Sequence, residues 1–171
     1  VESARTPTLA ALLTGRLPGR TGCQRVTPPG QKFGLAPWEY TLARMLSDVG
    51  YRTAIYGKWH LGNSPDRHPT AHGFDEWYGI QDSTAPAMHS SLTGFEQWME
   101  TPKIWEGRAG QPAEALAEYD LDNRPLIDEW ITTRACAFID ERGRDRHPFF
   151  LYVPLTQVHH LAMLIADDLH L

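Results

Sequence analysis

The sequence predicts an α/β fold, in which helices pack against a mostly parallel central sheet. Apolar residues recur at helical spacing over 41–49, and Gly50 then leads into the strand-like segment 51–56. A second helical stripe over 124–141 precedes a continuous apolar run at 149–155. Such an uninterrupted run is typical of a central parallel strand that is covered on both faces. Because a helix is followed by a strand twice, we expect a layered α/β architecture.

Length and composition fit a globular domain and exclude several classes of protein. The chain has 171 residues, of which 42% are hydrophobic, so it can bury a substantial core. Its net charge of −5 argues against binding nucleic acid by neutralising phosphates, so we expect no nucleic-acid partner. No stretch approaches the roughly 18 apolar residues of a membrane span. The two cysteines, Cys23 and Cys136, can form one disulfide or none.

The first two helices are predicted from their end signals. The first is Thr8–Thr14, which has Pro7 just before it and Thr8 as its N-cap. The second covers 41–49, and Gly50 occupies the position after its C-terminus.

The third helix, 124–141, is the longest that the sequence predicts. Asn123 is placed to cap it, Pro125 suits its first turn, and Gly143 is expected to end it. Between 57 and 110 no regular element can be assigned, although several tryptophans indicate that this region is packed.

Three segments have the residue types of a functional site. The turn of residues 5–8 leads into the first helix, and a helix N-terminus attracts anions through its free N–H groups and its dipole. A capped helix without any ligand fits these residues as well.

The second segment, Gly57–Gly62, follows the strand at 51–56 directly. Ligands of open α/β sheets bind beyond the carboxyl ends of strands. Lys58 and His60 are two residues apart, so in an extended segment they project to the same side. A lysine and an imidazole together can hold an oxyanion and move a proton. A surface turn without a ligand fits the segment equally well.

The third segment holds His159 and His160, which follow the apolar run at 149–155. A histidine at this end of a strand is expected to face a ligand, whereas adjacent side chains diverge too far for a metal pair. The other histidines show no ligand spacing and are predicted to be ordinary loop or surface residues: His68, His72, His89, His147 and His170.

Together these segments resemble the sulfatase family of the alkaline-phosphatase-like superfamily. Residues 5–16 (RTPTLAALLTGR) are similar to the family's signature C-x-P-S-R-A-A-L-L-T-G-R. Residues 50–62 (GYRTAIYGKWHLG) resemble the second signature, and residues 72–79 (HGFDEWYG) resemble a third motif. Residues 149–159 are similar to the strand that ends in the family's substrate histidine. The motifs keep one order over nearly the whole chain, and they are nearest to arylsulfatase-like members.

The resemblance implies an alkaline-phosphatase-like sandwich, of which this chain is a partial domain, and the hydrolysis of small-molecule or glycan sulfate esters. In the family, a cysteine oxidised to formylglycine attacks sulfur, and a calcium ion neutralises the sulfate oxygens. By this resemblance, Lys58 binds a sulfate oxygen, and His60 contacts the nucleophile and assists elimination. His159 contacts the sulfate and the leaving-group oxygen as a general acid, and Ser83 corresponds to a sulfate-contacting serine of some members.

The chain departs from the family at the nucleophile. Arg5 stands where the cysteine belongs, Thr8 replaces the serine, and Leu9 replaces the motif's arginine. Arg5 cannot become formylglycine, and a guanidinium stays protonated and is no nucleophile. The family's calcium carboxylates come from segments before and after the matched region, so we assign no metal ligand here. We expect residues 1–171 to be an internal fragment of an N-terminal catalytic domain that is inactive alone, and the family suggests an extracellular, periplasmic or lysosomal protein.

Two alternative functions remain open. A sulfatase-fold protein without catalysis would bind sulfated glycans or another oxyanion, with Arg5 as a cation beside Lys58. A phosphodiesterase or phosphatase relative would use Thr6 or Thr8 as its nucleophile, but the sequence Lys58-Trp59-His60 favours the sulfatase branch.

Overall fold

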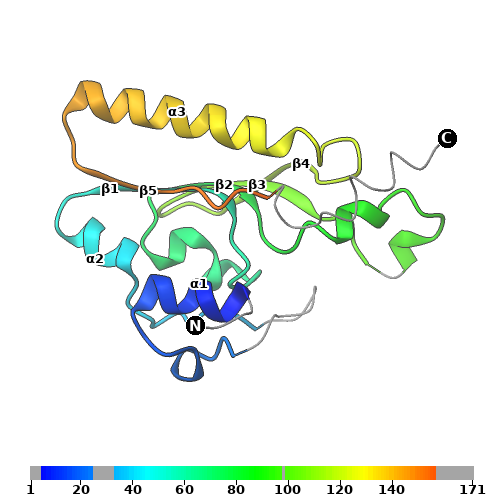
Figure 1. Ribbon diagram of the computed structural model, residues 1–171, viewed down its shortest axis with the longest axis horizontal. Helices are drawn as coiled ribbons and strands as arrows, with labels where there is room; N and C mark the ends of the chain where they lie inside the picture. The colour runs from blue at the N-terminus through cyan, green and yellow to red at the C-terminus, as the bar shows by residue number, and fades with distance from the viewer. Residues whose placement is uncertain (1–4, 25–32, 98, 157–171) are drawn as a thin grey trace.

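The computed structural model describes residues 5–24, 33–97 and 99–156, and these form a sheet with helices on both faces (Figure 1). The strand order is β4-β3-β2-β1-β5. The strands are β1 (Arg52–Lys58), β2 (Glu76–Ile80), β3 (Lys103–Arg108), β4 (Glu114–Glu118) and β5 (Phe149–Tyr152). In Figure 1, α3 (Ile127–Asp145) covers one face, and α1 (Arg5–Thr14) and α2 (Leu42–Asp48) cover the other. The predicted α/β class is therefore confirmed.

The sheet is mixed. Strand β1 pairs in parallel with both β2 and β5, as the helix–strand order predicts. Strands β3 and β4 add antiparallel pairings beyond β2, in the region where the sequence predicted no element. The prediction of a central position for the last strand is wrong within the described residues, because β5 ends the strand order and Phe149 is 37% exposed.

Helix α1 starts earlier than its sequence predicts. It begins at Arg5, so Thr8 lies inside the helix and the prediction that Thr8 is the N-cap is wrong. Pro7 falls in the first turn, where a proline is tolerated because the first backbone N–H groups of a helix have no partner within it. The residues expected to form a turn before the helix therefore form its first turn.

Helix α2 and strand β1 agree closely with prediction. The Oγ1 of Thr41 caps α2 by accepting a hydrogen bond from the N–H of Arg44 at 3.1 Å. Gly50 follows the helix with a φ of 89°, a left-handed conformation that glycine adopts without strain. Strand β1 runs two residues past the predicted end at Tyr56 and so includes Gly57 and Lys58.

Both predicted ends of α3 are wrong. The N-cap is Leu126, and Asn123 instead donates a side-chain hydrogen bond to the carbonyl of Glu118 at 2.9 Å. The helix continues through Gly143 to Asp145 and ends at Arg146, which has a φ of 54°. An interior glycine costs a helix about 1 kcal/mol, which the packing of the helix against the sheet outweighs.

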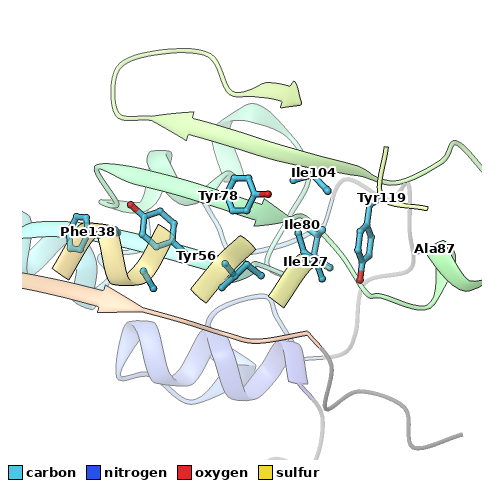
Figure 2. Close-up of a cluster of buried hydrophobic side chains, with 11 residues drawn as sticks. Tyr56, Tyr78, Ile80, Ala87, Ile104, Tyr119, Ile127 and Phe138 are labelled. Carbon is cyan, nitrogen blue, oxygen red and sulfur yellow. The ribbon is translucent and has the colours of Figure 1, made fainter. Parts of the chain in front are cut away.

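Each face of the sheet has its own core. Toward α3, residues of alternating strand positions pack against Ile127, Ile131 and Phe138, and Figure 2 shows the three tyrosines of this cluster, Tyr56, Tyr78 and Tyr119. The opposite core joins the strands to α1 and α2, and its buried members are Ala10, Leu13, Cys23, Leu35, Ala43, Ile55, Trp59, Leu61, Phe74 and Trp77. No helix among the described residues is long and apolar enough to cross a bilayer.

Candidate functional site

The carboxyl ends of three adjacent parallel strands form the candidate site. Lys58 at the end of β1 lies opposite Ile80 at the end of β2. On the other side, the N–H of Lys58 donates to the carbonyl of Pro154, just after β5, at 3.0 Å. The N–H of His60 donates to the carbonyl of Gln81 at 2.7 Å. The segments that follow β2, β1 and β5 therefore start side by side, as the sequence predicts for ligand-binding loops.

Glycines let these strands approach one another. Gly57 has a φ of 137°, and a Cβ there would collide with the carbonyl oxygen of Pro154. Gly79 has a φ of 146°, and a Cβ there would collide with the carbonyl oxygen of Gly57. Both positions need glycine for conformation and for space. The first glycine of the Gly-Lys-Trp-His segment therefore sets the position of Lys58.

Lys58 and His60 are both buried at this edge, at 7% and 2% exposure. His60 has a φ of 55°, so the extended conformation ends before it. The prediction that both side chains project to one side assumed an extended segment, and for His60 that assumption is wrong. Between them, Trp59 enters the α1–α2 core, and its indole N–H donates to the carbonyl of Arg67 at 2.8 Å. A left-handed conformation at a residue other than glycine costs of order 1 kcal/mol and is a common feature of functional sites.

The loop after β2 adds Ser83 and a carboxylate that the sequence analysis missed. Asp82 accepts a hydrogen bond from the side-chain amide of Asn63. Burial raises the pKa of Asp82 above its usual range, and the Asn63 hydrogen bond and the Lys58 charge lower it in part. Asp82 therefore lies within electrostatic reach of Lys58. Because strand β2 was not predicted, no signal in the sequence placed Asp82 at this edge of the sheet.

Two of the predicted site residues, Arg5 and His159, are not described in full by the structure. His159 lies outside the described residues. Arg5 is the first residue of α1, and the structure describes only its backbone. Next to it, Thr6 is fully buried, whereas Thr8 is exposed. Burial of Thr6 weighs against its use as a nucleophile. Leu9, at the place of the family's arginine, packs against the α1–α2 core.

Two histidines differ from the prediction of ordinary loop or surface residues. His68 precedes and His72 ends a short 3₁₀-helix of residues 69–72, and both are buried, at 5% and 1% exposure. His68 packs against Trp77 and Trp105, with ring centroids 5.1 and 5.7 Å apart. Their burial comes from tertiary packing of aromatic neighbours, which spacing along the chain does not reveal. His89 and His147 are exposed, and His170 lies outside the described residues.

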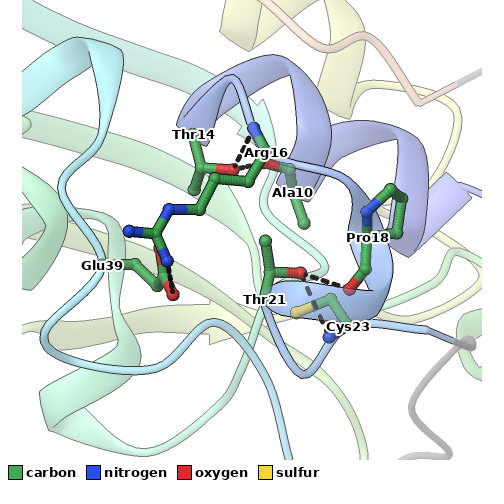
Figure 3. Close-up of polar contacts among 7 residues, drawn as sticks. All are labelled: Ala10, Thr14, Arg16, Pro18, Thr21, Cys23 and Glu39. Atoms are coloured by element: carbon green, nitrogen blue, oxygen red, sulfur yellow. Dashed lines mark hydrogen bonds and ion pairs between the residues drawn. The ribbon is translucent and has the colours of Figure 1, made fainter.

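The end of the first motif is structural. Thr14 donates to the carbonyl of Ala10 at 2.6 Å and accepts from the N–H of Arg16 at 3.2 Å. Figure 3 shows the Arg16 guanidinium reaching Glu39, with an N–O distance of 3.4 Å. These contacts fix the C-terminus of α1 and the loop that follows it.

The third motif, residues 72–79, is structural as well. The N–H of Thr53 donates to Asp75 at 2.9 Å, and the N–H of Asp75 donates to the Oγ1 of Thr53 at 2.9 Å. This reciprocal pair fixes the beginning of β1 relative to β2, at the edge opposite the candidate site.

The described residues do not fit a metal ion. Nowhere in the described part of the chain do three or more histidine, cysteine, aspartate or glutamate side chains come together as metal ligands. We therefore assign no calcium ligand among the described residues.

Comparisons with known proteins agree with the motifs. The family model named Sulfatase matches residues 3–164. N-acetylgalactosamine-6-sulfatase of Sus scrofa is 34% identical over 164 residues, which cover 90% of this chain and 30% of that protein. Arylsulfatase A of Bos taurus is 38% identical over 165 residues, which cover 91% of this chain and 32% of that protein.

A solved structure shares the fold. The PsFucS1 sulfatase from Pseudoalteromonas sp. superimposes with a TM-score of 0.81 and 28% sequence identity. The match covers 94% of this chain and 35% of that structure, so this chain spans about a third of the length of these relatives. Because the family model covers more than nine-tenths of the sequence, the chain belongs to the sulfatase family.

Proposed function

We propose that this chain contributes the sulfate-binding residues of a sulfate-ester hydrolase. The observation that carries the proposal is the burial of Lys58 and His60 at the carboxyl end of β1, beside the loop that holds Ser83. A cation and an imidazole at such a strand end suit a bound oxyanion. The family to which the chain belongs supports the choice of a sulfate ester.

Each residue has a distinct proposed role. Lys58 donates a charge-assisted hydrogen bond to a sulfate oxygen and so stabilises the negative charge. The role proposed for His60 is to hydrogen-bond the nucleophile and assist elimination, a step that requires a nucleophile other than Arg5. The hydroxyl of Ser83 donates to a second sulfate oxygen. His159 protonates the leaving-group oxygen as the alcohol departs.

The residue at the nucleophile position supports a second candidate function. Arg5 begins α1, where the helix dipole also favours anions. An arginine there cannot attack sulfur, but it adds a permanent cation. We therefore propose, as the alternative, a protein that binds sulfated glycans or another oxyanion without turning it over.

One set of measurements separates the two functions. The product of the natural gene is incubated with 4-nitrophenyl sulfate and calcium, and inorganic sulfate is titrated by calorimetry. A hydrolase turns over the ester, and Lys58→Ala removes the activity. A binder shows no turnover, but it binds sulfate with an affinity that Arg5→Ala weakens. Turnover gained only by Arg5→Cys with Leu9→Arg, in a host that makes formylglycine, would assign the lost activity to these two positions. Neither turnover nor sulfate binding would contradict both functions.

A further inference from the structure

A cavity of about 450 Å³ lies beside the candidate site. Its wall includes Asn63 from the loop after β1, residues 80–83 at the end of β2, and residues 99–103 at the start of β3. The volume falls within the range of small-molecule sites. Ser83, a proposed sulfate contact, is part of the wall, so a ligand in the cavity would be next to the proposed sulfate position.

Asp82 connects the cavity to Lys58. Its carboxyl group lines the cavity, is hydrogen-bonded by Asn63 and lies within electrostatic reach of the Lys58 ammonium group. The carboxylate balances part of the lysine charge on the cavity side.

The rest of the wall suits a neutral, hydroxyl-bearing ring. Trp105 is held by stacking on Trp77, with ring centroids 6.4 Å apart and planes 7° from parallel. The amide of Gln81 and the hydroxyl of Thr101 can both donate and accept hydrogen bonds. A rigid aromatic surface with a few such polar groups is typical of a pocket for a polar organic ligand.

The charges of the wall do not favour an anion. Glu100 and Asp82 are acidic, and Lys103, the one basic side chain among the described residues of this wall, is paired with Glu100 at 2.7 Å. A second sulfate or a carboxylate in the cavity would meet the negative charge of Asp82, which Lys58 offsets only in part, with no unpaired cation among the described residues of the wall.

We propose that this cavity binds an uncharged, hydroxyl-bearing ring of the substrate, adjacent to the sulfate group. We propose that Asp82 excludes a second anionic group from this cavity. Asp82 is thus a specificity-determining residue. The inference rests on the proposed function for the identity of the neighbouring sulfate site, but binding to the cavity itself requires no turnover.

The test compares two sugars that carry no sulfate. A neutral methyl hexopyranoside and the matching methyl hexuronoside are titrated into the protein, and binding is followed by tryptophan fluorescence and ligand-observed NMR. We expect the neutral sugar to bind at least about tenfold more tightly than the uronic acid at pH 7. Asp82→Asn should reduce this affinity ratio to near one. Glu129→Gln, at an exposed position of α3, should leave the ratio unchanged.

A second variant controls for a local rearrangement around Asp82. Asp82→Ser removes the charge without placing another amide beside Asn63, and it should reduce the ratio in the same way. Failure of the neutral sugar to bind, equal binding of the two sugars, or a ratio that survives both variants would overturn the inference. Inorganic sulfate titrated in parallel reports on the proposed sulfate-binding residues, so failure of the proposed function shows there and not in the sugar ratio.

Discussion

The carboxylate of Asp128, in the first turn of α3, accepts three hydrogen bonds from Thr156. The backbone N–H of Thr156 lies 2.8 and 3.1 Å from the two carboxylate oxygens, and its hydroxyl lies 2.8 Å from Oδ1. Thr156 is buried and comes four residues after the end of β5. The contact therefore ties the segment after β5 to the helix that covers one face of the sheet.

Asp128→Ala should lower the free energy of unfolding by about 2 kcal/mol. The substitution leaves the buried N–H and hydroxyl of Thr156 without this acceptor, and hydrogen bonds to a charged group are the stronger kind. Urea unfolding followed by circular dichroism measures the change. Asp140→Ala, on an exposed part of the same helix, is the control and should change stability by less than about 0.5 kcal/mol. Equal effects of the two substitutions would contradict this role of Asp128.

The local sequence signals for α2 and β1 predict these elements correctly in the folded chain. Thr41 caps its helix by its own side chain, and Gly50 supplies the left-handed residue that ends it. At α3 the same kinds of signal failed, because the Asn123 side chain donates to the carbonyl of Glu118 instead and Gly143 sits where a helix can continue. Capping residues thus predict an end where they keep the capping hydrogen bond, as Thr41 does while its hydroxyl also donates to the carbonyl of His72.

The candidate site was predictable in part. The glycine before Lys58 and the position of Lys58 after a strand gave the edge of the sheet correctly. Strand β2 was not predicted, so the loop that follows it, with Asp82, could not be placed beside Lys58. The pairing of β2 with β1 depends on residues 22 apart in sequence, such as Ala54 and Glu76, which no local pattern reveals.

Gly79→Ala should destabilise the protein by more than about 2 kcal/mol. A methyl group there meets the backbone of Gly57, and the positive φ adds strain for any other residue. Gly143→Ala is the matched control, because a Cβ at Gly143 meets nothing within 4 Å and the position is helical. This control should stabilise the protein by about 0.5–1 kcal/mol. Thermal unfolding of both variants tests the close approach of β1 and β2, and a neutral Gly79→Ala would disprove it.

The two cysteines are both free, so of the two possibilities left by the sequence, the structure has no disulfide between them. Cys23 is buried, and this burial raises the pKa of its thiol. Cys136 is exposed on α3. The two thiols should therefore react at very different rates, because the thiolate is the reactive form and must be accessible.

A thiol reagent such as 5,5′-dithiobis(2-nitrobenzoate) should modify one cysteine quickly in the folded protein and both in guanidinium chloride. Cys136→Ser should remove the fast phase, whereas Cys23→Ser should leave it intact. Two fast thiols in the folded protein would contradict the burial of Cys23, and none in denaturant would indicate a disulfide.

His72 is buried at the end of the short 3₁₀-helix of residues 69–72, near the positive charges of Arg44 and Arg67. Its ring lies 5.8 Å from that of Trp59, centroid to centroid. Burial, together with the nearby charges of Arg44 and Arg67, lowers the pKa of His72 from 6.5 to about 4, and Asp66 partly offsets this shift. The neutral imidazole is thus the form that the folded protein accommodates.

This shift predicts a loss of stability in acid. Between pH 6.5 and about 4 the unfolded chain binds a proton at His72 that the folded chain does not, so stability falls as pH falls through this window. The full effect approaches about 3 kcal/mol below pH 4, and it vanishes above pH 6.5. His72→Gln should flatten this part of the pH profile in urea unfolding, leaving the smaller slope due to His68, whose pKa burial also lowers. His89→Gln, at an exposed histidine, should leave the profile unchanged, and an equal slope in His72→Gln would show that other groups cause the acid loss.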